Sequence, residues 1–241
     1  MTSPPPLLVW FRQDLRIGDN PAFASALEQA RAGGHPVIGF YCLDETSSDS
    51  RALGGASRWW LHHSLARLRD ALAAYNIPLI LRRDRADAQV SALITETGAR
   101  HLFWNRQYEA AAIARDTELK TALTAQGVTV ESSNALLLVE PWEVKTGQGG
   151  PFQVFTPFWR AARPLAAARP PLPVPAPGRL PDPPVLASDP LERWDLLPTA
   201  PIGLGACATS GRPARPVRWR GSMISSPHAS PPMPTRATGP I

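Results

Sequence analysis

Short apolar runs alternate with amphipathic segments throughout the first 135 residues. The runs hold about four to six apolar residues, too few for a helix, and are typical of strands buried on both faces. Between them, apolar residues recur at helical spacing. The expected strands cover residues 7–11, 37–42, 77–81, 101–104 and 128–131, and the expected helices cover residues 21–32, 57–75, 86–97 and 109–125. This alternation predicts an α/β fold, a doubly wound five-stranded parallel sheet with strand order 3-2-1-4-5.

The first strand ends abruptly in charged residues. Arg12, Asp14 and Arg16 all lie within a few residues of the strand's end. Asp19 or Asn20 can cap the next helix, and Pro21 suits the first helical position, where its missing N–H costs nothing. A buried strand, a charged loop and a capped helix form the entry to a parallel sheet, where ligands bind at strand ends. The charged residues could equally form a structural ion-pair cluster, and the two roles are compatible.

Periodicity fades after about residue 135, and the charge is unevenly placed. Residues 136–201 hold little periodic structure and many prolines, so we expect an irregular connector. The chain has 25 basic and 20 acidic residues, and residues 202–241 contain five arginines but no acidic residue. Residues 1–201 therefore carry 20 of each sign. The basic excess belongs to the tail and gives no evidence for a DNA-binding surface on the folded part.

Several functional classes are disfavoured by what the sequence lacks. It has no glycine-rich dinucleotide motif after the first strand and no P-loop, which argues against a dehydrogenase or a P-loop NTPase. Cys42 and Cys207 give neither a disulfide framework nor metal-ligand spacing, so we expect no metal site. No signal peptide and no membrane-spanning apolar run is present. We therefore expect a soluble, cytoplasmic protein that does not enter a membrane.

A candidate ligand site follows from the predicted strand order. The order reverses next to the first strand, which leaves a crevice at the carboxyl ends of the first and fourth strands. Aromatic faces, a carboxylate and guanidinium groups near that crevice suit a planar heteroaromatic ligand. The alternative is that these polar groups only satisfy one another. The candidate residues for this site are Arg12, Cys42, Arg58, Asn105, Glu109 and Arg115.

Two stretches resemble one known family. Residues 9–23, VWFRQDLRIGDNPAF, resemble the W-F-R-x-D-L-R-x-x-D-N-x-A opening of the DNA photolyase and cryptochrome family. Residues 140–164, EPWEVKTGQGGPFQVFTPFWRAARP, resemble the family segment that leads from the α/β domain toward the flavin domain. The resemblance covers residues 7 to about 200 and implies a Rossmann-like antenna domain at residues 1–135 followed by an interdomain connector.

The resemblance implies a function in light-driven DNA repair. Deoxyribodipyrimidine photolyases split cyclobutane pyrimidine dimers with FAD held in a helical domain, which the resemblance does not reach. We therefore expect an antenna domain that is inactive alone and monomeric, with FAD and damaged DNA bound only by the full-length parent. Three alternatives stay open: a cryptochrome-like blue-light receptor, a non-catalytic nucleotide-binding α/β module, and an interaction protein that uses its Pro/Arg-rich tail.

The resemblance also bears on the antenna chromophore. Folate-binding members carry an Asn-Glu pair where this chain has Ala111 and Ala112. Deazaflavin-binding members share a pattern that this chain matches at four positions. These are Cys42, Arg58, Glu109 and Arg115. We therefore expect a flavin or deazaflavin antenna.

The tail at residues 202–241 departs from the family pattern. It lacks acidic residues, lysine and apolar periodicity, so we expect it to be disordered. If one base were restored before codon 202, synonymous codons would permit a sequence that resembles the family's continuation. We therefore expect this segment to be an out-of-frame reading of a longer photolyase gene.

Overall fold

A five-stranded parallel sheet forms the centre of the protein. The computed structural model describes residues 4–47, 52–166 and 170–198. The strand order is β3-β2-β1-β4-β5, which confirms the predicted order, and every pairing is parallel. The strands are β1 (Leu7–Phe11), β2 (Val37–Leu43), β3 (Leu79–Arg83), β4 (His101–Asn105) and β5 (Thr129–Ser133). The helices between them are α1 (Pro21–Gly33), α2 (Gly55–Ala73), α3 (Ala86–Thr97) and α4 (Ala110–Ala125).

Local sequence signals explain most of these boundaries. The Asn20 side chain accepts a hydrogen bond from the backbone N–H of Phe23 at 3.0 Å and caps α1, while Gly34 ends the helix in the left-handed conformation. Helix α2 begins at Gly55, two residues before Ser57, without a side-chain cap. Strand β3 begins later than predicted, at Leu79 rather than residue 77, because Pro78 has no N–H to donate to the ladder.

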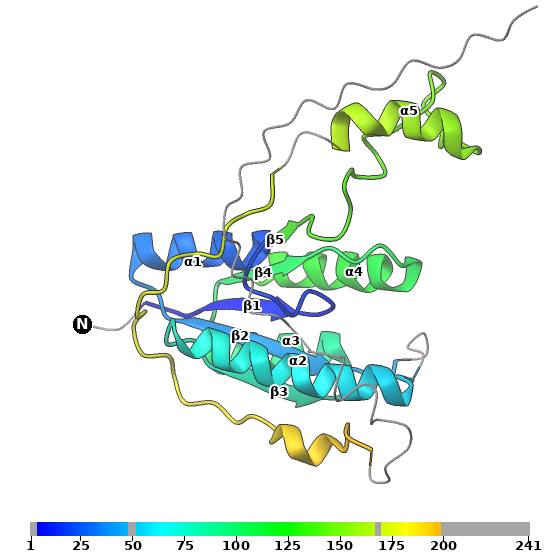
Figure 1. Cartoon of the computed structure of the whole chain (residues 1–241). Helices are drawn as coiled ribbons and strands as arrows, with labels where there is room; N and C mark the ends of the chain where they lie inside the picture. Colours follow the sequence, from blue (N-terminus) through cyan, green and yellow to red (C-terminus); the bar gives the residue numbers. More distant parts are fainter. Residues whose placement is uncertain (1–3, 48–51, 167–169, 199–241) are drawn as a thin grey trace, which may run out of the picture.

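Helices cover both faces of the sheet (Figure 1). Helices α1 and α2 pack with Leu7, Val9 and Phe11 on one face. Helices α3 and α4 pack on the other face with Leu8 and Trp10. Alternate residues of one strand therefore enter two separate cores, which is the reason that β1 is apolar throughout.

The segment after the sheet is extended for much of its length but includes one helix that the sequence did not predict. Helix α5 (Phe155–Ala166) lies away from the sheet layers in Figure 1. Pro157 and Pro164 argue against a helix, yet Pro157 lies in the first turn, where no intrahelical N–H donor is needed. Residues 170–198 then return to the domain, pass α1 and α2, and include a short 3-10 helix at Leu191–Trp194.

Two further expectations concern the tail at residues 202–241 and the absence of a membrane-spanning helix. The predicted disorder and frame change of residues 202–241 lie outside the described residues. Among the residues that the structure describes, no helix is both long and apolar enough to span a bilayer.

Candidate functional site: a cleft at the strand ends

A cleft with a volume of about 1170 Å³ opens at the carboxyl ends of β1 and β2. Its walls are the start of α3 and most of the length of α4, which cover the same face of the sheet. Small side chains on α4, those of Ala111, Ala112 and Ala114, line one wall and leave room between the helices. The cleft therefore forms next to the point where the strand order reverses, as expected for a doubly wound sheet.

Trp10 forms an aromatic surface deep in the cleft. Its side chain is almost fully buried and meets the Trp104 ring edge-on at a centroid distance of 5.6 Å. The guanidinium carbons of Arg12 and Arg115 lie 4.7 Å and 5.3 Å from the Trp10 ring centroid. Two cations against one indole give an electron-rich surface flanked by positive charge, an arrangement suited to a flat ring that carries carbonyl groups.

Asp116 holds both guanidinium groups in place. One carboxylate oxygen lies 2.6 Å from Arg12 Nη1, and the other lies 3.0 Å from Arg115 Nη2. Arg115 also donates to Gln107 Oε1 at 2.9 Å. Burial lowers the pKa of Arg12, although Asp116 opposes that effect. The Arg12 Nε atom is buried and has no acceptor within the described chain. An orphan donor of this kind indicates a position that a bound ligand or water completes.

Asn105 organises the loop behind the cleft. Its Nδ2 donates to Asn20 Oδ1 at 2.7 Å and to Asp14 Oδ2, and its Oδ1 accepts from the backbone N–H of Ala22 at 3.2 Å. The Arg12 guanidinium donates to the Asn105 backbone carbonyl. Asp14, Asn20 and Asn105 are all buried. Because every member is hydrogen-bonded, this network fixes β1, α1 and β4 relative to one another.

The β2 side of the cleft is acidic. Asp44 accepts hydrogen bonds from Ser47 Oγ at 2.6 Å and from the Ala86 backbone N–H at 3.1 Å. Burial alone would raise the pKa of Asp44, but these hydrogen bonds outweigh burial and lower it. Burial raises the pKa of the Cys42 thiol to about 12, so the thiol is neutral at physiological pH and is a poor nucleophile.

The six predicted site residues divide into two groups. Arg12, Cys42, Glu109 and Arg115 line the cleft. Asn105 lies behind it in the buried network. Arg58, on α2, reaches the rim only through Glu45, which it meets at 3.0 Å. Glu109 accepts from Gln13 at 3.4 Å, whereas Arg115 pairs with Asp116 and not with Glu109.

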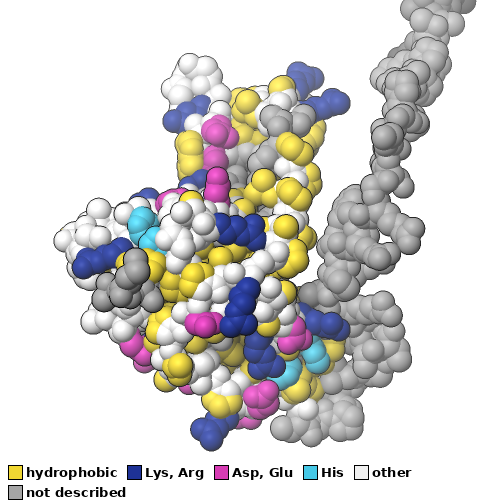
Figure 2. Space-filling model, turned by 90° about the vertical axis from the view of Figure 1, so that its left-hand side faces the viewer, with side chains coloured by type: hydrophobic (Ala, Val, Ile, Leu, Met, Phe, Trp, Pro, Cys, Tyr) yellow, Lys and Arg dark blue, Asp and Glu magenta, His cyan; other side chains and the backbone are white. Residues whose placement is uncertain are grey.

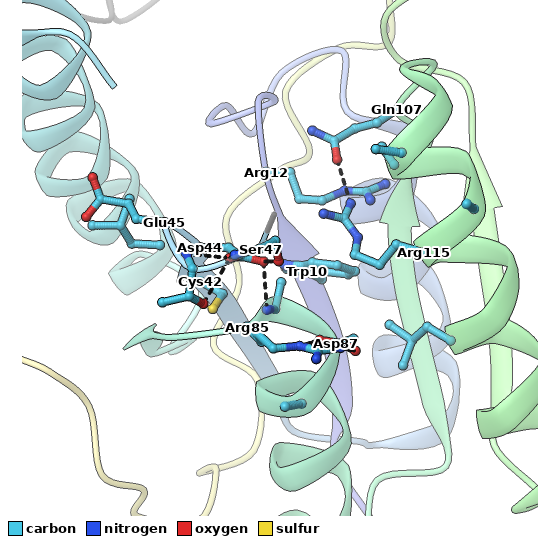
Figure 3. A pocket seen from close by; sticks show the side chains of 18 of the residues that line it. Trp10, Arg12, Cys42, Asp44, Glu45, Ser47, Arg85, Asp87, Gln107 and Arg115 are labelled. Carbon is cyan, nitrogen blue, oxygen red and sulfur yellow. Dashed lines mark hydrogen bonds and ion pairs between the residues drawn. The ribbon is translucent and has the colours of Figure 1, made fainter. Parts of the chain in front are cut away.

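Sequence reasoning missed the contribution of α3. Arg85 and Asp87 line the cleft at the start of that helix and form an ion pair at 2.7 Å. Glu118, one turn beyond Arg115 on α4, was also missed. The available signal was that α3 follows a strand whose carboxyl end points to the same edge of the sheet. Figure 3 shows Arg12, Arg115 and Gln107 on one side of the cleft, with Cys42, Asp44, Glu45 and Ser47 on the other.

Comparison with known proteins identifies relatives of this arrangement. The family model for DNA photolyase matches residues 7–177. The deoxyribodipyrimidine photo-lyase of Agrobacterium fabrum is 42% identical over 200 residues, which are 81% of this chain and 39% of that protein. Cryptochrome-1 of Arabidopsis thaliana is 44% identical over 154 residues, which are 63% of this chain and 22% of the cryptochrome.

A solved structure agrees with the sequence matches. The crystal structure of a bacterial class III photolyase from Agrobacterium tumefaciens superimposes with a TM-score of 0.72 at 40% identity. The superposition covers 83% of this chain and 40% of that structure. The chain thus spans about two fifths of the photolyases that it resembles.

Proposed function

The chain belongs to the DNA photolyase family, and from that premise we propose that it forms the light-harvesting part of a deoxyribodipyrimidine photolyase. In this role the cleft holds an antenna chromophore, whose contribution is to absorb light for the repair reaction. The family is flavin-dependent. Because the chain spans 39% of the Agrobacterium relative, we assign FAD and damaged DNA to the full-length parent.

One observation carries this proposal: the buried Trp10 ring lies at the strand ends beside two guanidinium groups that are themselves fixed by Asp116. A site that is rigid before the ligand enters loses little conformational entropy on binding. Flat aromatic surfaces and a few directed polar groups are typical of sites for planar cofactors. No general base or activated nucleophile is needed for light absorption, and the neutral Cys42 thiol is consistent with that role.

We propose a flavin or deazaflavin as the chromophore. Arg115 presents donors near the indole, and the Arg12 Nε has no acceptor in the described chain. The carbonyl oxygens of an isoalloxazine ring are acceptors of the required kind. The alanine wall formed by Ala111 and Ala112 offers no hydrogen-bonding group, which disfavours a pterin that needs polar partners at that position.

Titration with riboflavin, followed by quenching of tryptophan fluorescence, tests this function. We expect saturable binding, and we expect Arg115→Ala to weaken it by about tenfold to 150-fold, because the ligand loses a charged hydrogen-bond donor worth about 1.5–3 kcal/mol. Arg67→Ala, an exposed arginine on α2, is the matched control and should leave binding unchanged. No saturable binding of any flavin, or tighter binding of methenyl-folate than of riboflavin, contradicts the proposal.

A further inference from the structure

We propose that the cleft selects a chromophore that has hydroxyl groups on its side chain and no phosphate group. This inference rests on the proposed function, because it concerns the same cleft and narrows the ligand within the flavin class. Two observations support it. Asp44 lies at the N-terminus of α3, and each arginine among the described residues that line the cleft is paired with a carboxylate.

Asp44 occupies the position where a nucleotide phosphate would be expected to bind. The N-terminus of α3 opens into the cleft, and free backbone N–H groups at a helix N-terminus attract phosphate. Here the Asp44 carboxylate accepts from the Ala86 backbone N–H at 3.1 Å and so fills that position. Its other hydrogen bonds come from the neutral groups of Thr46 and Ser47. The carboxylate stays charged near neutral pH and repels a second anion.

The arginines on the described lining already have carboxylate partners. Arg12 and Arg115 share Asp116, at 2.6 Å and 3.0 Å, and Arg85 pairs with Asp87 at 2.7 Å. A phosphate would have to displace one of these carboxylates to gain a bidentate contact. The charged residues of the described lining are three basic, Arg12, Arg85 and Arg115, and five acidic, Asp44, Glu45, Asp87, Glu109 and Glu118.

The same acidic surface suits a polyhydroxyl chain. A hydroxyl donates readily to a carboxylate oxygen, whereas a phosphate dianion has only acceptors to offer. In Figure 3 the carboxylates of Asp44 and Glu45 lie across the cleft from Arg12 and Arg115. A ring placed against Trp10 would therefore direct its ribityl chain either along this wall or out of the cleft. Along the wall, a hydroxyl can exchange with the hydroxyl that Ser47 donates to Asp44 at 2.6 Å. The phosphate of FMN would instead meet the Asp44 carboxylate at the N-terminus of α3.

A pair of ligands tests the selection without any variant. Riboflavin and FMN share the ring and ribityl chain and differ in the phosphate alone, so we expect riboflavin to bind at least about tenfold more tightly at low salt. The difference should shrink as salt is added, because screening weakens repulsion. Equal affinity, or tighter binding of FMN, overturns the selection but leaves a flavin site intact. Failure of both ligands to bind overturns the flavin site itself and this inference with it.

A variant locates the cause. Asp44→Asn removes the charge but keeps an oxygen for the Ala86 N–H, so the ratio of riboflavin affinity to FMN affinity should fall toward one. Asp70→Asn, on the exposed surface of α2, is the control and should leave the ratio of the two affinities unchanged. An unchanged ratio in a folded Asp44→Asn protein, with thermal unfolding as the folding check, contradicts the role of Asp44.

Discussion

Two segments that follow the sheet differ in whether their large apolar side chains are buried. Residues 170–198 return to the α1 and α2 face, where Leu191 and Trp194 are each 2% exposed. Helix α5 holds Phe155 and Trp159, which are 71% and 40% exposed. Figure 2 shows hydrophobic side chains on the surface of the upper part of the molecule, at the height where Figure 1 places α5. Apolar content alone therefore does not decide which segment joins the core.

Backbone hydrogen bonds to the domain distinguish the two segments. The N–H of Leu180 donates to the Tyr75 carbonyl at 3.1 Å, and that of Asp189 donates to the Leu81 carbonyl at 2.8 Å. Because β3 is an edge strand, the second contact also covers part of a free sheet edge. An extended chain has unsatisfied N–H groups to offer such an edge. Helix α5 satisfies its own backbone, so only side chains are left to hold it against a neighbour.

Removing the largest buried side chain of the docked segment should give the largest effect. Trp194 packs against Tyr41 at a ring-centroid distance of 6.1 Å and donates from Nε1 to Asp189 at 3.2 Å. Trp194→Ala should lower the free energy of unfolding by about 3–5 kcal/mol, measured by urea denaturation. Trp60→Ala, at a side chain 49% exposed on α2, is the control and should cost about 1 kcal/mol or less. Equal losses in both variants would contradict the docking of residues 170–198.

A smaller effect is expected at Tyr75, whose hydroxyl donates to the Pro175 carbonyl at 2.6 Å. Tyr75→Phe should cost about 1 kcal/mol at neutral pH, because a partly buried acceptor loses its donor. Burial raises the pKa of Tyr75, so the contribution is complete below the unfolded-state value of about 10 and is lost as pH rises through the higher folded-state value. The gap between wild type and Tyr75→Phe should therefore narrow above about pH 10. A gap that widens there would refute the assigned hydrogen bond.

The sheet was accessible to sequence reasoning because its signals are local. Five apolar runs and the capping residues near Asn20 define the elements, and the right-handed connection rule limits the strand order. The docked segment was not accessible. Nothing near Leu191 or Trp194 in the sequence indicates that these residues enter a core built from α1 and α2, because the contact depends on the path of an extended chain.

In the candidate site, the positions of the residues could be predicted from the sequence, but their ion-pair partners could not. The strand ends predicted where Arg12, Cys42, Glu109 and Arg115 would gather. The ion-pair partners could not be predicted, since the pairing of Arg12 with Asp116 joins residues 104 positions apart. Which carboxylate an arginine selects depends on side-chain geometry within a few ångströms, and strand periodicity carries no such detail.

The smallest effect should come from α5, and it completes the comparison. Phe155 and Trp159 stack on each other at a centroid distance of 6.3 Å, and both are exposed, Phe155 more than Trp159. Substituting both by serine should change the free energy of unfolding of the α/β domain by less than about 0.5 kcal/mol, because little buried area is lost and the helix lies away from the sheet. The urea midpoint is the measurement, with Trp194→Ala run in parallel as the destabilised reference.

The opposite outcome would be a loss of more than about 1 kcal/mol of unfolding free energy in the double variant, a loss typical of side chains with buried contacts. In that case α5 would unfold together with the sheet, and the contrast with residues 170–198 would fail. Helical signal near 222 nm provides the second readout: partial loss of helicity without a shift in midpoint means that α5 folds independently of the sheet.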